Sequence, residues 1–260
     1  MRRTILCGLL AAAALAVPAQ AARPIPVQVD GEKLETAAYV EEGVTYVPLR
    51  DLLEELGGWE VWWDGQTKTA AASSGETRLS ASPDRNTVTI DGSVYTGRVS
   101  VVNGRTYLPL RPVIKALGGD VQWDARLGGA AATTAEAAYN AVDFYWLARI
   151  INAESGGEPL EGQIAVGNVV LNRVESPDFP NTIPEVIFDC AGSVQFEPVE
   201  NGTVYREPSE LSVEAARRVL AGENTVGKAM FFYAPALSEG VWINDNCEYQ
   251  ETIGCHRFYK

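Results

Sequence analysis

The chain has 260 residues, of which 46% are hydrophobic, and its 34 acidic side chains outnumber 21 basic ones, for a formal net charge of −13. A surface of this charge repels phosphate backbones and anionic lipid headgroups, which makes nucleic acids and membrane surfaces poor candidates for partners. The length suits one large domain or two smaller ones.

The first 21 residues have the pattern of a secretory signal peptide. Two arginines follow the initiator methionine, residues 5–17 are apolar, and Ala19-Gln20-Ala21 is a small-residue cleavage site. The apolar run is shorter than the roughly 20 residues that a membrane-spanning helix needs. We therefore expect residues 1–21 to be removed and the mature protein to be secreted, without membrane contact after cleavage.

An internal repeat follows the predicted signal peptide. The segment TYVPLR at 45–50 recurs as TYLPLR at 106–111, and Gly-Gly at 57–58 and Trp-Asp at 63–64 also have second copies, at 118–119 and 123–124. Each copy predicts β-strands with tight turns, among them hairpin turns at Glu42-Gly43 and Asn103-Gly104, and a short helix that ends at the Gly-Gly pair. We predict two small β-rich modules, at 24–75 and 84–135.

Neither module contains a histidine, a cysteine or a recognisable acid–base pair, so we expect both to be dispensable for chemistry. Trp59, Trp62 and Trp63 have rings that can stack on sugars, but such aromatics are more often core or half-buried strand residues, and that is the expected role. The repeated TYVPLR…LGG…WD pattern resembles the stalk domain at the N-terminus of some copper amine oxidases. The resemblance implies a spacer or attachment module that binds the cell wall or another surface component, without copper chemistry.

The character of the sequence changes after an Ala/Gly/Thr-rich stretch at 128–141, within which we place a linker at 136–142. Apolar residues then recur at helical spacing from residue 143, again after Pro159, and between residues 209 and 220. Short strands are expected near 194–196, 203–205 and 230–233. The region 143–260 is predicted to be one α+β domain, so that the fold class is multidomain, with repeated β-rich modules before an α+β domain.

Glu154 is the strongest candidate for a catalytic residue. It comes at the end of the apolar helix in LARIINAESGGEP (147–159), immediately before a break of small residues. Apolar packing behind a carboxyl group raises its pKa, while small neighbours leave it open to a cleft. These are the conditions for a general acid near neutral pH.

The sequence LARIINAESGGEPLEGQIAVGNVVLNRV, together with SVQFEPVENG (193–202), AMFFYAP (229–235) and TIGCHRFYK (252–260), resembles the catalytic domain of SleB-type cell-wall hydrolases. This resemblance implies a lysozyme-like fold, lytic transglycosylase activity on the glycan strands of peptidoglycan, no cofactor, and a place in the cell wall or spore envelope of a spore-forming bacterium. The family's catalytic glutamate corresponds to Glu154. Gln195 and Phe196 correspond to a cleft-lining strand, and Tyr233 and His256 to segments near the groove.

Glycosidic cleavage requires a proton on the leaving oxygen, and ordinary hydrolysis usually adds a second carboxylate. Glu158 and Glu161 are near Glu154 in sequence, but acids at a helix start also favour the helix dipole. For Glu161 the helix-start role is the better interpretation; for Glu158, which we keep as a substrate-binding candidate, both roles stay open. A transglycosylase needs no second carboxylate, so a hydrolytic muramidase or glucosaminidase is the alternative.

Other classes of wall protein fit less well. A zinc amidase generally takes three zinc ligands, commonly histidines, and this chain has one histidine, so no metal is expected. A cysteine endopeptidase would use Cys190 or Cys255 with His256 as its base, in no recognisable motif. A wall-binding protein without activity remains a third reading. Of the three cysteines after the signal, we predict a disulfide between Cys247 and Cys255, the closest pair in sequence.

Overall fold

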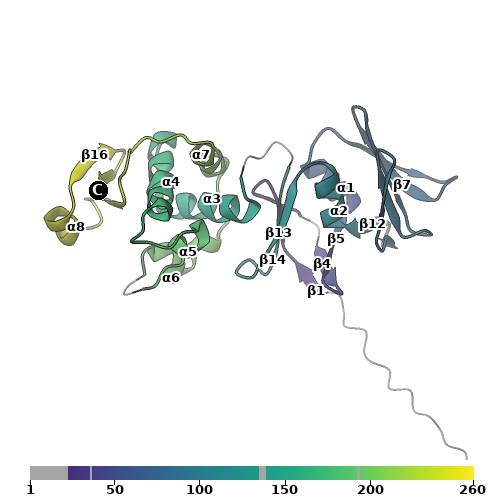
Figure 1. Ribbon diagram of the computed structural model, residues 1–260, viewed down its shortest axis with the longest axis horizontal. Helices are drawn as coiled ribbons and strands as arrows, with labels where there is room; N and C mark the ends of the chain where they lie inside the picture. The colour runs from purple at the N-terminus through teal and green to yellow at the C-terminus, as the bar shows by residue number, and fades with distance from the viewer. Residues whose placement is uncertain (1–22, 36, 135–138, 192–193) are drawn as a thin grey trace, which may run out of the picture.

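The computed structural model describes residues 23–260 apart from 36, 135–138 and 192–193 (Figure 1). The predicted signal peptide therefore lies outside the described residues. The N-terminal half contains the elements β1 (Arg23–Ile25), β2 (Val27–Val29), β3 (Glu32–Lys33), β4 (Ala38–Glu41), β5 (Val44–Pro48), α1 (Leu49–Glu55), β6 (Glu60–Asp64), β7 (Thr69–Ser74), β8 (Thr77–Ser82), β9 (Thr87–Ile90), β10 (Ser93–Thr96), β11 (Ser100–Val102), β12 (Arg105–Pro109), α2 (Leu110–Ala116), β13 (Asp120–Asp124) and β14 (Gly129–Thr133).

The two sequence repeats do not form separate modules. Their strands combine in three sheets, with the orders β1-β4-β5-β12-β11, β10-β9-β8-β7-β6 and β13-β14-β2-β3. All three sheets contain strands from both copies, and one hydrophobic core runs through both copies. The prediction of a β-rich N-terminal half is thus confirmed, but the division at residues 75 and 84 is wrong. The hydrogen-bonding edges of each copy are completed by the other copy.

The two copies are related by a local two-fold axis. In the antiparallel pair of β5 and β12, Val47 lies opposite Leu108, and these two residues occupy equivalent positions of the repeat. Tyr46 likewise lies opposite Pro109, and Pro48 opposite Tyr107. When equivalent residues of two copies face one another in an antiparallel pair, a two-fold axis passes between them. Most elements of one copy have a counterpart on the opposite side of this strand pair, whereas β8, which lies between β7 and β9, has none between β14 and β2.

Local sequence explains the turns and short helices of this half. Glu42 and Gly43 both have positive φ, 52° and 77°, as do Asn103 and Gly104, 51° and 77°. This is the backbone of the predicted two-residue hairpin turns, whose twist matches that of the flanking strands. In both copies the helix then follows a proline, buries three aliphatic side chains, and ends before the Gly-Gly pair.

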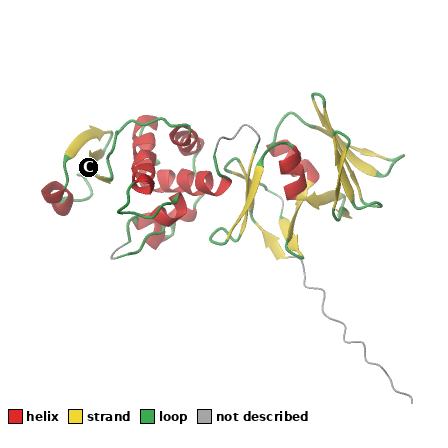
Figure 2. Ribbon diagram, in the orientation of Figure 1, coloured by secondary structure: helices red, strands yellow, loops and turns green. Residues whose placement is uncertain are grey.

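The C-terminal half is mainly helical (Figure 2). Its elements are α3 (Ala141–Ser155), α4 (Leu160–Glu175), α5 (Ile183–Ile187), α6 (Glu197–Asn201), a 3₁₀ turn η1 (Thr203–Tyr205), α7 (Glu210–Leu220), β15 (Phe231–Tyr233), α8 (Val241–Asn246), β16 (Tyr249–Ile253) and β17 (His256–Tyr259). The helices α3, α4 and α7 pack on one another around a core that includes Phe144, Trp146 and Ile151. The strands form a small sheet of order β15-β17-β16. The predicted α+β architecture and its three long helices are confirmed.

Three local predictions are wrong. The stretch from residue 128 is not a linker, because Gly129–Thr133 is β14, which pairs with β13 and runs parallel to β2. Of the linker placed at 136–142, residues 136–138 lie outside the described residues, and α3 already begins at Ala141. The expected strand at 194–196 is not regular structure, and Thr203–Tyr205 is a 3₁₀ turn.

The two halves are in close contact through α3, which packs against β13 and β14 (Figure 1). The Nε1 of the fully buried Trp146 donates a 2.9 Å hydrogen bond to Oδ2 of Asp124 on β13. At Gly31, whose φ is +92°, an added Cβ would lie 2.7 Å from the ring of Phe144. Such close approach shows that the contact between the two halves is tightly packed.

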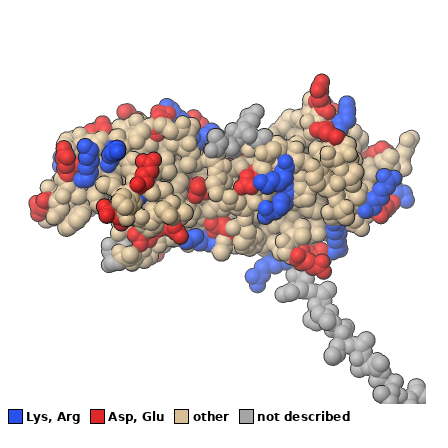
Figure 3. All heavy atoms as spheres, in the orientation of Figure 1, with Lys and Arg blue, Asp and Glu red and all other residues tan. Residues whose placement is uncertain are grey.

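Charged side chains of both signs are scattered over both halves on the face shown in Figure 3.

Candidate active site

Glu154 is the next-to-last residue of α3, and the sequence after it ends the helix. Ser155 turns its hydroxyl back to donate to the Ile151 carbonyl, 2.8 Å away, and the chain then passes through Gly156 and Gly157. Pro159 precedes α4 and cannot continue the first helix, because proline lacks an amide hydrogen. The carboxyl group of Glu154 is therefore carried on a rigid, buried helix and presented where the bulk of the chain is smallest.

The environment of Glu154 raises its pKa to about 7. Burial is the largest cause, because an ionised carboxylate loses its hydration there, and the negative charge of Glu197 adds to the effect. The positive charge of Arg173 acts in the opposite direction. A carboxyl group with this pKa is mostly protonated below pH 7 and can still give up its proton, as a general acid must.

Arg173 is a site residue that the sequence did not reveal. It lies on α4, is 5% exposed, and donates from Nε to the Met230 carbonyl at 2.8 Å. Its guanidinium lies 5.1 Å from the ring centre of Phe196, and its Nη1 atom has no hydrogen-bond partner among the residues that the structure describes. Burial lowers the pKa of Arg173 to about 10, against the attraction of Glu154. The sequence does contain a signal for Arg173: its charged side chain continues the apolar stripe of α4 that Val166, Val170 and neighbouring residues form.

Glu154 lines a cavity of about 460 Å³ in the C-terminal half. The wall combines the end of α3, the start of α6, the segment before α7 and the strand β15 with its following loop. Its polar or aromatic members include Asn152, Glu154, Glu197, Arg206, Tyr233 and His256. Glu197 is exposed and faces the same space, so this cavity contains two carboxyl groups that come from different helices.

Two of the predicted site residues join Glu154 in the cavity wall. Tyr233 lies on β15, where its hydroxyl exchanges hydrogen bonds with Asn244 at 3.0 and 3.2 Å, and these bonds lower its pKa. His256 begins β17 and is 8% exposed, with its ring edge-on to Phe232 at 5.4 Å. Burial lowers the pKa of His256 despite the nearby Glu158, so the imidazole is neutral near pH 7.

Glu158 is neither a solvated acid at a helix start nor a carboxylate in the wall of the Glu154 cavity. Its side chain is 10% exposed, and Oε2 accepts a 2.9 Å hydrogen bond from the backbone N–H of Cys255. Oε1 lies 3.9 Å from Nδ1 of His256. Gly254 leaves room for this contact, because an added Cβ there would lie 1.8 Å from Oε2 and its φ is +58°. Glu158 therefore anchors the β16–β17 turn and does not line the cavity.

The remaining predicted residues lie near the cavity but not in its wall. Phe196 is 2% exposed and directly precedes α6, with its ring against Arg173, so it supports the site from behind. Gln195 is half-buried, and its backbone N–H donates to the Asp189 carbonyl at 3.4 Å. The predicted cleft-lining strand at these residues is replaced by a loop that leads into α6.

The predicted disulfide is not formed, since Cys190, Cys247 and Cys255 are all free thiols. Cys247 follows α8 at one end of β16, and Cys255 lies in the turn at the other end. A strand of five residues alone spans about 17 Å, whereas bridged cysteines have Cα atoms within about 7 Å. Proximity in sequence was misleading because an extended strand separates the two cysteines.

Two further observations concern the described part of the chain only. It contains no group of three or more His, Cys, Asp or Glu side chains placed to hold a metal ion. None of its helices combines the length and the apolar character needed to cross a bilayer.

Comparisons with known proteins match each half of the chain separately. Residues 157–259 match the family described as Cell Wall Hydrolase, beginning just after Glu154, and residues 28–129 and 96–138 match the copper amine oxidase N-terminal domain. The spore cortex-lytic enzyme of Bacillus cereus is 35% identical over 122 residues, which are 47% of this chain and 46% of that enzyme. The chain thus spans about half the length of this relative.

A shorter relative is covered more fully. The cell wall hydrolase CwlJ of Oceanobacillus iheyensis is 32% identical over 37% of this chain and 72% of its own length. The solved catalytic domain of the germination-specific lytic transglycosylase SleB from Bacillus anthracis is 34% identical over 47% of this chain and 98% of that domain, with a TM-score of 0.42. Both resemblances predicted from the sequence motifs are confirmed: behind a domain like the N-terminal domain of copper amine oxidases, this chain belongs to the cell-wall hydrolase family.

Proposed function

We propose that the chain degrades peptidoglycan by cleaving its glycan strand as a lytic transglycosylase, with Glu154 as the catalytic residue. The observation that carries the proposal is the Glu154 carboxyl group, with its pKa of about 7, in the wall of a cavity of about 460 Å³. Relatives are named spore cortex-lytic enzyme and cell wall hydrolase, so spore-cortex peptidoglycan is the first substrate to test, and a secreted protein would meet it outside the membrane.

The proposed reaction uses one carboxyl group twice. Protonated Glu154 gives its proton to the glycosidic oxygen between N-acetylmuramic acid and N-acetylglucosamine, and the bond from that oxygen to the anomeric carbon of the muramic acid breaks. The carboxylate left behind then takes the proton from the muramic acid's own 6-hydroxyl, whose oxygen bonds to the anomeric carbon. A 1,6-anhydro ring and a free hydroxyl are formed, and no water is consumed.

The neighbours of Glu154 support both steps. Burial and Glu197 favour the protonated form that the first step needs, and the buried charge of Arg173 favours the carboxylate that forms next. Tyr233 and neutral His256 supply hydrogen-bonding groups in the same wall, which suits contacts with sugar hydroxyls. We propose these two as substrate-contacting residues, and Phe196 and Glu158 as supports for the cavity wall.

One observation favours a second candidate function. Glu197 lines the same cavity and is close enough to raise the pKa of Glu154. A carboxylate in that position is what a two-carboxylate hydrolase needs to activate a water molecule or to attack the anomeric carbon. The hydrolase alternative therefore passes from Glu158, which is bound to the β16–β17 turn, to Glu197.

Matched variants and product analysis separate these two functions. Glu154→Gln keeps the size of the side chain but cannot donate the proton, and we expect kcat on purified glycan to fall by about 10²–10⁴-fold or more, since one group serves both steps. Glu197→Gln is the discriminating control and is expected to cost less than 10-fold. Products are analysed by mass spectrometry after reaction in H₂¹⁸O: anhydro ends without label support the transglycosylase. Labelled reducing ends with a collapse in Glu197→Gln would establish the hydrolase instead.

A further inference from the structure

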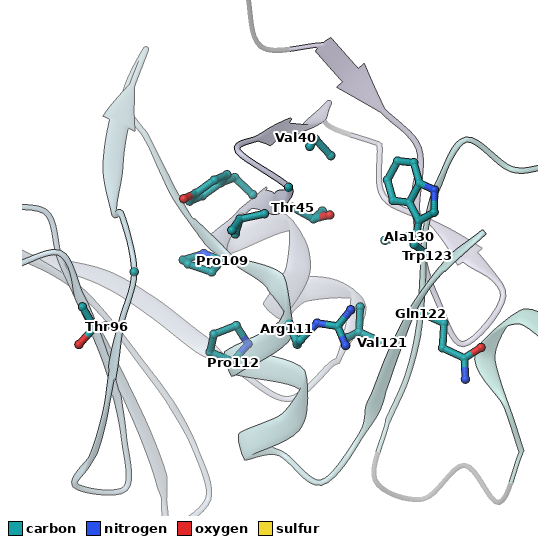
Figure 4. A pocket seen from close by; sticks show the side chains of 14 residues that line it. Val40, Thr45, Thr96, Pro109, Arg111, Pro112, Val121, Gln122, Trp123 and Ala130 are labelled. Atoms are coloured by element: carbon teal, nitrogen blue, oxygen red, sulfur yellow. The ribbon is translucent and has the colours of Figure 1, made fainter. Parts of the chain in front are cut away.

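Two grooves lie on the surface of the N-terminal half, away from the Glu154 cavity. The first, which we call groove 1, has a volume of about 470 Å³, and the second, groove 2, about 240 Å³. Figure 4 shows groove 1 with Trp123 on one side, Pro109 and Pro112 on the other, and the Arg111 side chain reaching between Pro112 and Val121. No residue of the proposed reaction belongs to either groove.

The two grooves are counterparts under the local two-fold axis. Each groove is formed by the hairpin turn of one copy together with the helix start and the Trp-Asp strand of the other copy. The lining residues of the two grooves can be paired by their positions in the repeat. With the residue of groove 1 first, the pairs include Gly43 and Gly104, Val44 and Arg105, Thr45 and Thr106, Pro109 and Pro48, Arg111 and Arg50, Val121 and Val61, Trp123 and Trp63, and Ala130 and Ala70. One surface site has therefore been built twice, which a chance depression between side chains does not explain.

Each groove exposes a tryptophan, a residue type that is highly buried on average in soluble proteins. Trp63 and Trp123 are each 51% exposed, on edge strands β6 and β13. Trp62, also in groove 2, is 45% exposed, whereas Trp59 packs against the core. The expected role as core or half-buried strand residues thus places Trp59 against the core and leaves Trp62 and Trp63 as half-exposed residues of β6. Exposed tryptophans at equivalent positions of both copies point to a ligand with a flat apolar face, such as a sugar ring.

Each groove also carries an arginine at an equivalent position. Arg111 and Arg50 are exposed, and neither forms an ion pair with any residue that the structure describes. Arg50 donates a 3.4 Å hydrogen bond to the Val61 carbonyl. On a chain of net charge −13, guanidinium groups that have no acidic partner among the described residues and lie beside tryptophans select a ligand that carries negative charge. The grooves differ at one point: groove 2 has Asp51 where groove 1 has Pro112, so groove 1 is the better anion site.

We propose that groove 1 binds a peptidoglycan glycan strand, with Trp123 stacked on a sugar ring and Arg111 bound to a carboxylate of the muramic acid lactyl group or its peptide stem. This assignment rests on the proposed function, because it takes the ligand from the polymer that the C-terminal half is proposed to cleave. Groove 2 is the weaker copy of the same site. The N-terminal half then holds the enzyme on an insoluble substrate between cleavage events.

Binding of the full-length Glu154→Gln chain to insoluble sacculi tests the proposal, because this variant does not digest its ligand. The sacculi are first treated with hydrofluoric acid to remove phosphate-linked wall polymers, and binding is measured by co-sedimentation. We expect Trp123→Ala and Arg111→Ala each to weaken binding by roughly 10-fold, the loss of a central interface residue, and Trp63→Ala to weaken it less. Arg78→Ala, an exposed arginine on β8 in neither groove, is the matched control and should bind normally.

Two results would overturn the assignment. One is unchanged binding in both Trp123→Ala and Arg111→Ala, with circular dichroism confirming that both are folded. The other is loss of binding by the Glu154→Gln chain itself after hydrofluoric acid treatment of the sacculi, which would identify a phosphate polymer as the ligand. Cleavage assays on short soluble glycans and on sacculi, with otherwise wild-type chains, keep the two proposals distinguishable: on sacculi, Trp123→Ala should be slower than the Arg78→Ala control. A wild-type chain that cleaves neither substrate would refute the proposed function and leave the binding result standing.

Discussion

The raised pKa of Glu154 predicts that the carboxyl group lowers the stability of the folded protein as pH rises. The pKa is about 7 in the folded chain against an ordinary value of 4.5. Between these two values the folded state binds more protons than the unfolded state, so the free energy of unfolding must fall with increasing pH. At 1.36 kcal/mol per pKa unit, the contribution lost between pH 4.5 and pH 8 is about 3 kcal/mol.

Replacing Glu154 by Gln removes this pH dependence, because the amide stays neutral. We expect the variant to match the wild type near pH 4.5 and to exceed it by up to about 3 kcal/mol at pH 8. The measurement is urea denaturation of both chains at half-unit steps from pH 4.5 to 8.5. The exposed Glu161→Gln variant, at the start of α4, controls for the loss of one negative charge.

A difference between wild type and Glu154→Gln that stays constant across this range would refute the reasoning. It would mean that the carboxyl group is hydrated in solution and not held in the buried environment that the structure gives it. A difference that grows toward low pH would be worse for the proposal, because it would mean a lowered pKa. Glu154 would then be ionised at neutral pH and unable to act as the acid in the first step.

Three further substitutions test the surroundings of the site. Arg173→Met removes the charge that opposes the raised pKa of Glu154, so the alkaline limb of the pH–rate profile should move to higher pH; an unmoved limb contradicts this role. Gly254→Ala places a methyl group onto the carboxylate of Glu158 and should lower the free energy of unfolding by about 1–3 kcal/mol, measured by thermal denaturation, whereas an unchanged melting temperature would show that the turn is not anchored. Trp146→Phe leaves Oδ2 of Asp124 without its donor, and a cost of about 1–3 kcal/mol is expected, while a neutral result would mean that water replaces the indole.

What the sequence revealed depended on how far apart the relevant residues are. The position of Glu154, at the end of a buried helix, was predictable because that helix and the small-residue break after it are contiguous in sequence. The role of Glu158 was not, because its partners are the backbone of Cys255 and the ring of His256, almost 100 positions later. Arg173 was missed for the same reason, since its hydrogen-bond partner is the carbonyl of Met230.

The repeat shows a different limit. The pattern correctly predicted the hairpin turns at Glu42-Gly43 and Asn103-Gly104, since positive φ at two successive residues is a local demand on those residue types. The pattern could not show that the copies interlock, because the sequence of one strand does not determine which other strand it pairs with. The pairing of Val47 with Leu108 is set by the tertiary fold. The grooves escaped notice because each contains residues of both copies.

The parallel pairing of β2 with β14 constrains the order in which the chain can fold. Ala131 on β14 pairs with Gln28 on β2, so the last strand of the stalk-like domain closes against one of its first. A contact between such distant segments is entropically costly and slow to form. If the chain emerges N-terminus first, β2 must wait until β14 has appeared, by which point α3 follows only a few residues behind. Completion of the third sheet and docking of α3 on it should therefore be nearly simultaneous, and a pulse-labelling hydrogen-exchange experiment would see both protected in the same phase.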